Sequence, residues 1–317
     1  MSRPRRRPVI IDCDPGVDDA IALLLAFASP ELDVRGVTTV AGNVSLEQAT
    51  RNAGHVLDLV GAPAALPLVA GLAGPVSGAV RIPDEPMHGV GGLGGLPVPD
   101  GPRRPTAGNA VDWLAERALA EPGVLTLLAI GPLSNVAALL DRHPQAGPAL
   151  REIVVMGGAA HAQGNVTPAA EFNFHADPEA AHRVLTSGAA VRVVGLDVTR
   201  AALFPGAAAE RLAALPGAAG VAGALLCGFV ARYQERYGVA AVPVHDALAV
   251  AAVTHPGLLG WEAGEAGVEC AGELTRGALV ADLRRPERSR DVEIALRVDA
   301  DAFTALLTER LAGYAGR

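Results

Sequence analysis

The first chemically suggestive residues are four aspartates within eight positions: Asp12, Asp14, Asp18 and Asp19. The Pro15-Gly16 pair between them predicts a sharp turn, which brings Asp14 back towards the two later aspartates. Four carboxylates in so small a space repel one another unless some hold protons or a cation lies among them. Oxygen ligands alone favour a hard cation, Ca²⁺ or Mg²⁺, over zinc. A calcium-hand loop is excluded because Leu23 stands where that loop needs Glu.

A second acidic position comes late in the chain, where His245-Asp246 opens an apolar helix. This pair would complete a metal site and supply a proton donor if it lay at the same edge of a sheet. Its local sequence alone favours an ordinary helix N-cap beside a surface histidine.

Glu171-Phe172-Asn173, preceded by Asn165, offers one carboxylate and two amides within one loop. Such groups can hydrogen-bond several sugar hydroxyls at once. Ordinary turn chemistry is the alternative interpretation of this loop, because Asn and Gly are common in turns.

Three of the few aromatic residues, Phe229, Tyr233 and Tyr237, share one helix face at i, i+4 and i+8. We expect Phe229 to pack in the core, and the two tyrosines to stack on or bond to a planar base.

The stretch Gly71 to Pro105 is rich in Gly and Pro and has no periodic pattern. It contains a literal GxGxxG at 89–94, but no strand precedes it, so we reject a dinucleotide site. The stretch predicts either a flap that supplies His88 or a plain surface loop.

Short apolar runs alternate with helical patterns through the first half of the chain, which predicts a mostly parallel, doubly wound (Rossmann-like) open sheet with helices on both faces. The expected strands are Pro8 to Cys13, Leu32 to Val40, Leu66 to Val69, Val124 to Ile130, Glu152 to Met156, Val191 to Val198, Ala278 to Leu283 and Val292 to Val298. The chain from Ala207 to Tyr237 is expected to be largely helical. We expect one domain over residues 8–317 with a helical C-terminal subregion, and a disordered arm over residues 1–7, where four arginines gather.

Composition excludes several classes of protein. The chain of 317 residues has a net charge of −8, which gives it no general attraction to nucleic acid. It contains no Lys, so chemistry that needs a Lys nucleophile or phosphate clamp is excluded. Three cysteines without a CxxC pair favour a cytoplasmic protein over a disulfide framework. No apolar run is long enough for a membrane span, and the run after the arginines is too short for a signal peptide.

These motifs together resemble the inosine–uridine-preferring nucleoside hydrolases over nearly the whole chain. The resemblance rests on Asp12 to Asp19, Thr38 to Asn43, Gly131 to Asn135, Met156 to Gly158, Glu171 to Asn173 with Asp177 to Ala181, and His245-Asp246. It implies a small-molecule ribonucleoside substrate and a homodimer or homotetramer. It also implies a Ca²⁺ ion held by Asp14, Asp19, the carbonyl of Ile130 and Asp246.

By the same resemblance, Asp18 is the general base and Asp12 orients the loop. The implied ribose contacts are Asn43, Met156, Asn165, Glu171 and Asn173. Glu171 could also stabilise positive charge on the sugar, and His245 with His88 would be the donors that help the base to leave. Tyr237 matches the pyrimidine-preferring relatives, which favours uridine and cytidine over a broad inosine–uridine range. Two alternatives stay open: a non-catalytic calcium-dependent nucleoside-binding or ribose-binding protein, and a haloacid-dehalogenase-type phosphatase, which the lack of Lys opposes.

Overall fold

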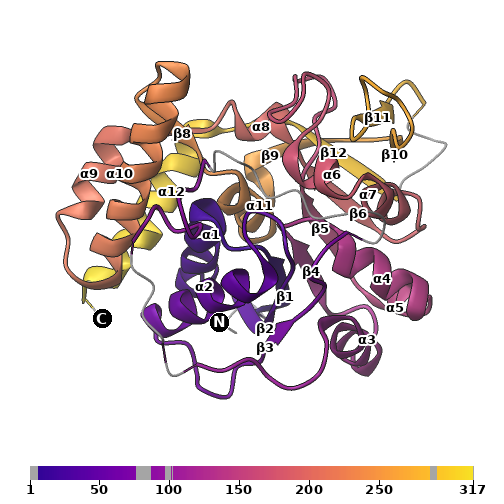
Figure 1. Cartoon of the computed structure of the whole chain (residues 1–317), viewed down its shortest axis with the longest axis horizontal. Helices are drawn as coiled ribbons and strands as arrows, with labels where there is room; N and C mark the ends of the chain where they lie inside the picture. Colours follow the sequence, from indigo (N-terminus) through magenta and orange to yellow (C-terminus); the bar gives the residue numbers. More distant parts are fainter. Residues whose placement is uncertain (1–5, 76–86, 97–100, 102, 286–290, 317) are drawn as a thin grey trace.

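The computed structural model describes residues 6–75, 87–96, 101, 103–285 and 291–316 (Figure 1). Eight strands form the central sheet in the spatial order β3-β2-β1-β4-β5-β6-β12-β9. Their bounds are β1 Arg7–Cys13, β2 Leu32–Thr39, β3 Leu68–Ala70, β4 Thr126–Ala129, β5 Glu152–Met156, β6 Val191–Val194, β9 Leu259–Ala263 and β12 Val292–Val298. All neighbours pair in parallel except β9, which runs antiparallel to β12 at the edge. The predicted mostly parallel sheet is confirmed.

Helices cover both faces of this sheet. They are α1 Val17–Ala28, α2 Leu46–Leu59, α3 Ala110–Ala120, α4 Ser134–Arg142, α5 Ala146–Ala149, α6 Phe172–Ala176, α7 Pro178–Leu185, α8 Leu196–Thr199, α9 Gly206–Ala213, α10 Gly217–Tyr237, α11 His245–Thr254 and α12 Ala300–Ala312. Short 3₁₀ turns lie at η1 Pro256–Leu258 and η2 Gly313–Gly316. Two small antiparallel sheets pair β7 Leu203–Pro205 with β8 Ala241–Pro243, and β10 Glu265–Val268 with β11 Leu279–Asp282.

Strand β1 shows why both faces are apolar. Successive side chains of a strand point to opposite faces. Val9 and Ile11 pack in the core beneath α1 and α11, whereas Ile10 packs in the second core, with α3 and α4. Asp12 therefore shares the face of Ile10, away from α1.

The order of the strands places a switch point beside β1. The chain leaves β1 for β2 and then β3, and it returns to β4 on the other side of β1. The loops after β1 and β4 diverge here, and ligands of open α/β sheets bind in the crevice that this divergence leaves. The aspartate-rich segment follows β1 directly, so the fold brings it to that crevice.

The helical subregion lies at one end of the molecule, where α9, α10 and α12 gather, and the β10–β11 sheet lies at the other (Figure 1). The expected helical stretch from Ala207 to Tyr237 forms two helices, with Pro205 directly before α9 and Pro216 directly before α10. Helix α10 ends where Gly238 adopts a left-handed φ of 74°. No helix in the described ranges is long and apolar enough to cross a membrane.

The strand expected at Ala278 to Leu283 is confirmed as β11, which pairs with β10 outside the central sheet. Two other sequence expectations are wrong in detail. The strand expected at Val191 to Val198 ends at Val194, because Gly195 begins the short helix α8. Within the expected disordered arm, Arg7 is already part of β1 and pairs with Glu152 at 3.0 Å, whereas residues 1–5 lie outside the described residues.

Substitution of Phe303 tests how much the packing of α12 against α1 contributes to stability. Its ring is fully buried. Phe303→Ala is expected to lower the free energy of unfolding by about 3–5 kcal/mol, because the removed ring leaves a cavity that the core cannot refill. Urea unfolding measures this, and the exposed Glu309→Ala in the same helix should change it by less than about 0.5 kcal/mol. Equal effects of the two substitutions would contradict this packing.

Candidate active site

The loop between β1 and α1 folds back on itself, as the Pro-Gly pair predicts. The carboxylate of Asp19 accepts hydrogen bonds from the backbone N–H groups of Asp14, at 3.1 Å, and Gly16, at 2.9 Å. Asp19 thereby caps its own helix from the third position. The turn brings the two aspartates together on a rigid backbone.

Asp14 is held in a narrow space between two glycine-containing loops. Its Oδ2 accepts a hydrogen bond from the backbone N–H of Asn43 at 2.6 Å, and its Oδ1 is buried without a partner. A Cβ on Gly42 or Gly131 would collide with these carboxylate oxygens. The loops after β2 and β4 thus leave room for Asp14 only because they carry glycine there.

Helix α11 brings a further carboxylate to the start of α1. One ligand oxygen from each of Asp18, Asp19 and Asp246 lies within 4.8 Å of the others. Burial, followed by the neighbouring negative charges, raises the pKa of Asp246 and Asp14 well above the ordinary value. Burial also raises the pKa of Asp18 and of Asp19 to about 6.

These carboxylates fit a hard divalent cation. In the described part of the chain, His88 is the single basic residue within ion-pair distance of the four, 3.5 Å from Asp18. Buried oxygens of Asp14 and Asp18 have no hydrogen-bond partner there. Buried charges ordinarily have a counter-charge or a metal, and an all-oxygen donor set suits Ca²⁺ or Mg²⁺.

The carbonyl of Ile130 lies at the end of β4, beside this cluster. It accepts a hydrogen bond from the side-chain amide of Asn173 at 2.9 Å. A carbonyl oxygen has a second lone pair, so it can still bind a cation. Asn173 also donates to the carbonyl of Met156, at 3.1 Å, and so joins the ends of β4 and β5.

Asp12 lies on the opposite face of β1 and does not join the cluster. It accepts hydrogen bonds from Thr38 at 2.5 Å and from Asn135 at 2.8 Å. Burial raises its pKa to about 6. Asp12 thus ties β1 to β2 and α4 immediately behind the aspartate loop.

Two half-buried histidines lie next to the carboxylates. Nδ1 of His88 accepts a hydrogen bond from the backbone N–H of Val17 at 3.2 Å, so the proton of the neutral ring is on Nε2. Burial lowers the pKa of His88 to about 4. Burial, together with His88 and Arg200, lowers the pKa of His245 to about 3. Both rings are therefore neutral at pH 7.

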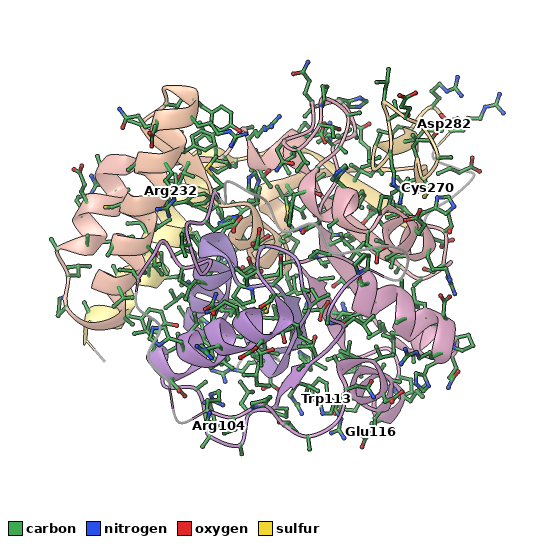
Figure 2. All side chains as sticks on the ribbon, in the orientation of Figure 1. Arg104, Trp113, Glu116, Arg232, Cys270 and Asp282 are labelled. Carbon is green, nitrogen blue, oxygen red and sulfur yellow. The ribbon has the colours of Figure 1, made fainter. Side chains whose placement is uncertain are left out.

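The segment 87–96 carries His88 and is held from two helices. Arg232 of α10 donates to the carbonyl of Met87 at 2.8 Å; its place on α10 is labelled in Figure 2. Asn52 of α2 donates to the carbonyl of Gly91 at 2.8 Å. The flap predicted over Gly71 to Pro105 is described only in part, because residues 76–86, 97–100 and 102 lie outside the described residues.

The predicted sugar-binding loop folds around Glu171. Its carboxylate caps α6 and accepts backbone N–H groups of Asn173 at 2.9 Å, Gly158 at 2.9 Å and Phe174 at 3.2 Å. Burial raises its pKa to about 7 despite these bonds. The side-chain oxygen of Asn165 is buried without a partner.

Two other predicted contacts lie at the margins of these loops. The side-chain amide of Asn43 is 3.4 Å from Asp19, which places Asn43 at the carboxylate cluster. Phe172 is half-buried at the start of α6.

Of the aromatic stripe, Phe229 packs in the core as expected. Phe229 is buried, and its ring lies 5.2 Å from that of His88. The ring centroids of Tyr233 and Tyr237 lie 4.6 Å apart, and Tyr237 is 46% exposed. The rings of Tyr233 and Tyr237 therefore continue from the Phe229–His88 contact towards solvent.

Three residues at this site were not identified from the sequence: Asn52, Thr199 and Arg232. Each acts through a neighbouring backbone or ring atom that is remote in sequence. Asn52 gave one signal, since it is a fully buried polar residue on the apolar face of α2. The other two gave none.

Known proteins with a similar sequence or fold identify the family to which this arrangement belongs. Residues 9–305 match the family described as inosine-uridine preferring nucleoside hydrolase. The pyrimidine-specific ribonucleoside hydrolase RihA of Salmonella gallinarum is 39% identical over 311 residues, 97% of this chain and 99% of the relative. Among solved structures, the plant nucleoside hydrolase PpNRh1 superimposes with a TM-score of 0.92 at 32% identity, covering 97% of this chain and 99% of that one. A purine-preferring ribonucleoside hydrolase from Gardnerella vaginalis gives 0.91 at 30% identity, with coverage of 98% and 99%.

The chain therefore belongs to the inosine-uridine preferring nucleoside hydrolase family, and it is an enzyme. The resemblance seen in the sequence motifs is confirmed.

Asp246→Asn tests the repulsion within the cluster. At about pH 7.5 the metal-free variant is expected to melt at a higher temperature than metal-free wild type, because one buried charge is gone. A carboxyl whose pKa rises on folding, as for Asp18 from 3.8 to about 6, destabilises the fold as pH increases through that window. The advantage of the variant should therefore shrink as pH falls towards about 4, where the carboxyls hold protons.

Thermal unfolding at both pH values measures this effect. The exposed Asp301→Asn is the control and should match wild type at each pH. An Asp246→Asn protein that is less stable than wild type at the higher pH would contradict the repulsion.

Proposed function

We propose that the protein hydrolyses the N-glycosidic bond of ribonucleosides in a Ca²⁺-dependent reaction, releasing ribose and the free base, with a preference for pyrimidine nucleosides. The observation that carries this proposal is the buried group of four carboxylates at the switch point, which lies beside two neutral histidines and has no charged basic side chain near it among the described residues. Family membership supports the same reaction class.

The residues that would hold the cation are Asp14, Asp19, Asp246 and the carbonyl of Ile130. When bound, Ca²⁺ would supply a Lewis acid that orients vicinal ribose hydroxyls and polarises water. Asp19 keeps two backbone hydrogen bonds while it faces the cluster, so its carboxylate is already oriented before any ligand arrives. Such fixed ligands lower the cost of ordering the site.

Asp18 is the proposed general base. Its Oδ1 has no hydrogen-bond partner, and its pKa of about 6 leaves it ionised at pH 7 but still able to hold a proton. Asp18 takes one proton from water as the water oxygen bonds to C1′ of the ribose. The C1′–N bond breaks, and its electron pair departs with the base.

His88 and His245 act on the departing base as hydrogen-bond donors. Both rings are neutral, and a neutral imidazole is a weak acid, so each can donate a hydrogen bond without giving up its proton. Such a bond stabilises the negative charge that develops on the base. The proton held by Asp18 can then pass through solvent to the free base, which balances the reaction.

The sugar is assigned to the loops after β2 and β5. Asn165 offers a buried, unpartnered oxygen, and Asn43 lies within 3.4 Å of the cluster. Glu171 already accepts three backbone N–H groups, but a carboxylate has about four acceptor positions, so one remains for a ribose hydroxyl. In its ionised form, Glu171 would also favour a transition state with positive character on the sugar.

The preference for pyrimidines is supported by the tyrosine pair and by RihA, the relative whose name is pyrimidine-specific. The partly exposed Tyr237 offers a ring against which a planar base can stack. A purine-preferring structural relative at 30% identity shows that the fold also accepts the other base class.

A reducing-sugar assay on uridine, cytidine, inosine and adenosine tests the function. We expect ribose from uridine and cytidine with the higher kcat/KM, no turnover of 2′-deoxyuridine, and loss of activity in EDTA that Ca²⁺ restores. Higher kcat/KM on inosine would contradict the base preference alone. Binding of uridine without ribose release by the calcium-loaded protein would contradict the enzymatic function.

Asp18→Asn tests the general base. The variant is expected to lose about 10³-fold in kcat on uridine, because the carboxamide cannot accept the proton of water. Its stabilisation by Ca²⁺ should remain, and without metal its melting temperature should not fall below that of wild type, because one buried charge of the cluster is gone. Asp301→Asn serves as the control with full activity, and an Asp18→Asn protein with wild-type kcat would exclude this role.

A further inference from the structure

The hydroxyl of Thr199 lies 2.7 Å from Nδ1 of His245. Thr199 is the last residue of α8 and is 1% exposed, whereas His245 is the first residue of α11. The two side chains come from different elements and meet immediately beside the carboxylate cluster. Among the described residues, this hydroxyl is the hydrogen-bond partner found for the ring of His245.

Helix α8 is short but firmly held in place. Leu196 and Val198 are buried in the core. The carboxylate of Asp197 accepts three backbone N–H groups from the loop after β5: Ala160 at 2.8 Å, His161 at 2.7 Å and Ala162 at 2.9 Å. The hydroxyl of Thr199 is therefore presented from an anchored backbone.

Arg200, directly after Thr199, extends the same anchoring. Its guanidinium donates to the carbonyls of Gln163 at 2.7 Å and Gly164 at 2.9 Å. Asn165, assigned above to the sugar, follows in the same loop. Thr199 and Arg200 thus connect the loop that contains Asn165 with His245, the histidine proposed to act on the base.

A hydroxyl beside a neutral imidazole can settle where the ring proton lies. The neutral ring carries one proton, on Nδ1 or on Nε2. For His88 the backbone N–H of Val17 can only donate, so the proton is on Nε2. A hydroxyl that donates to Nδ1 of His245 gives this second ring the same tautomer.

We propose that Thr199 is a positioning residue for the reaction: its hydroxyl donates to Nδ1 of His245, which fixes the orientation of the ring and leaves the ring proton on Nε2 for the departing base. This inference rests on the proposed nucleoside hydrolysis. No bond to Thr199 forms or breaks in the reaction. Its effect reaches the substrate through His245, as the outer partner of a functional histidine commonly does.

Thr199→Val removes the hydroxyl at nearly constant volume. We expect a loss of about 10–100-fold in kcat on uridine with little change in KM. Thr199→Ser, which restores the hydroxyl, should recover activity to within about threefold of wild type. The matched control is Thr254→Val, because Thr254 makes the same kind of contact with Nδ1 of His255, at 2.9 Å, outside the site.

A substrate with a good leaving group distinguishes a loss of His245 positioning from general damage to the active site. The 4-nitrophenyl riboside releases a stabilised anion that needs no help from His245. Thr199→Val should therefore cleave it at nearly the wild-type rate, and in a His245→Ala background the added Thr199→Val should have no further effect on uridine. Equal loss on both substrates, or additive losses in the double variant, would overturn the proposal.

Nitrogen NMR of ¹⁵N-labelled histidine reads the tautomer without activity. The chain has 8 histidines, and His245→Ala identifies the signal by its disappearance. We expect an unprotonated Nδ1 and a protonated Nε2 for His245 in wild type, and mixed tautomers in Thr199→Val. A wild-type His245 with its proton on Nδ1 would exclude the proposed hydrogen bond. Failure of wild type on both substrates, with the expected NMR pattern, would instead count against the proposed function.

Discussion

Mutual repulsion among buried carboxylates is the constraint on which the rest of this site depends. Asp14, Asp18, Asp19 and Asp246 meet where burial is nearly complete, and their pKa values rise accordingly. The start of α1 offers backbone N–H groups and a favourable helix dipole, but a dipole offsets only a fraction of one charge. Side chains that supply a full positive charge are missing from the described surroundings of the cluster. The folded chain therefore keeps an energetically unfavourable arrangement that a divalent cation would relieve.

The fold makes this arrangement possible by fixing each carboxylate from a different direction. The switch point between β1 and β4 opens the crevice, and the turn after β1 fills it with Asp14 and Asp19. Glycines at 42 and 131 let the neighbouring loops approach Asp14 closely. Asp12 holds β1, β2 and α4 together from behind through Thr38 and Asn135. Because backbone N–H groups hold the carboxylates of Asp14 and Asp19, these two side chains are restrained from moving apart to reduce their repulsion.

The sequence was most informative where chemistry is local. Asp12 to Asp19 lie within one turn, and the alternation of apolar runs predicted the parallel sheet around them. His245-Asp246 looked like an ordinary helix start, since its meaning depends on α11 packing against α1, a contact between distant segments. Thr199 lies just beyond the strand expected at Val191 to Val198, and no local pattern indicates its contact with His245, because only Gly195 marks the change from β6 to α8. The edge strand β9 escaped notice because Gly260 and Glu262 dilute its apolar pattern. Contacts between remote segments therefore decide the role of His245-Asp246, whereas local residues decide where β6 ends and why β9 is hard to recognise.

Burial acts on the acids and on the bases of this site in opposite directions. It raises the pKa of Asp18, so that carboxylate can hold the proton of a water molecule, and it lowers the pKa of His88 and His245, so those rings stay neutral. Proton acceptance therefore belongs to the carboxylate side, whereas the histidine side contributes fixed N–H dipoles. A leaving base stabilised by dipoles departs with more negative charge than one that receives a proton. Pyrimidine bases carry a carbonyl oxygen next to the glycosidic nitrogen that can share this charge, so a pair of oriented N–H donors suits them well. In the proposed reaction the tautomers of the two rings are as important as their positions, and the contacts at Nδ1, from Val17 and from Thr199, set those tautomers.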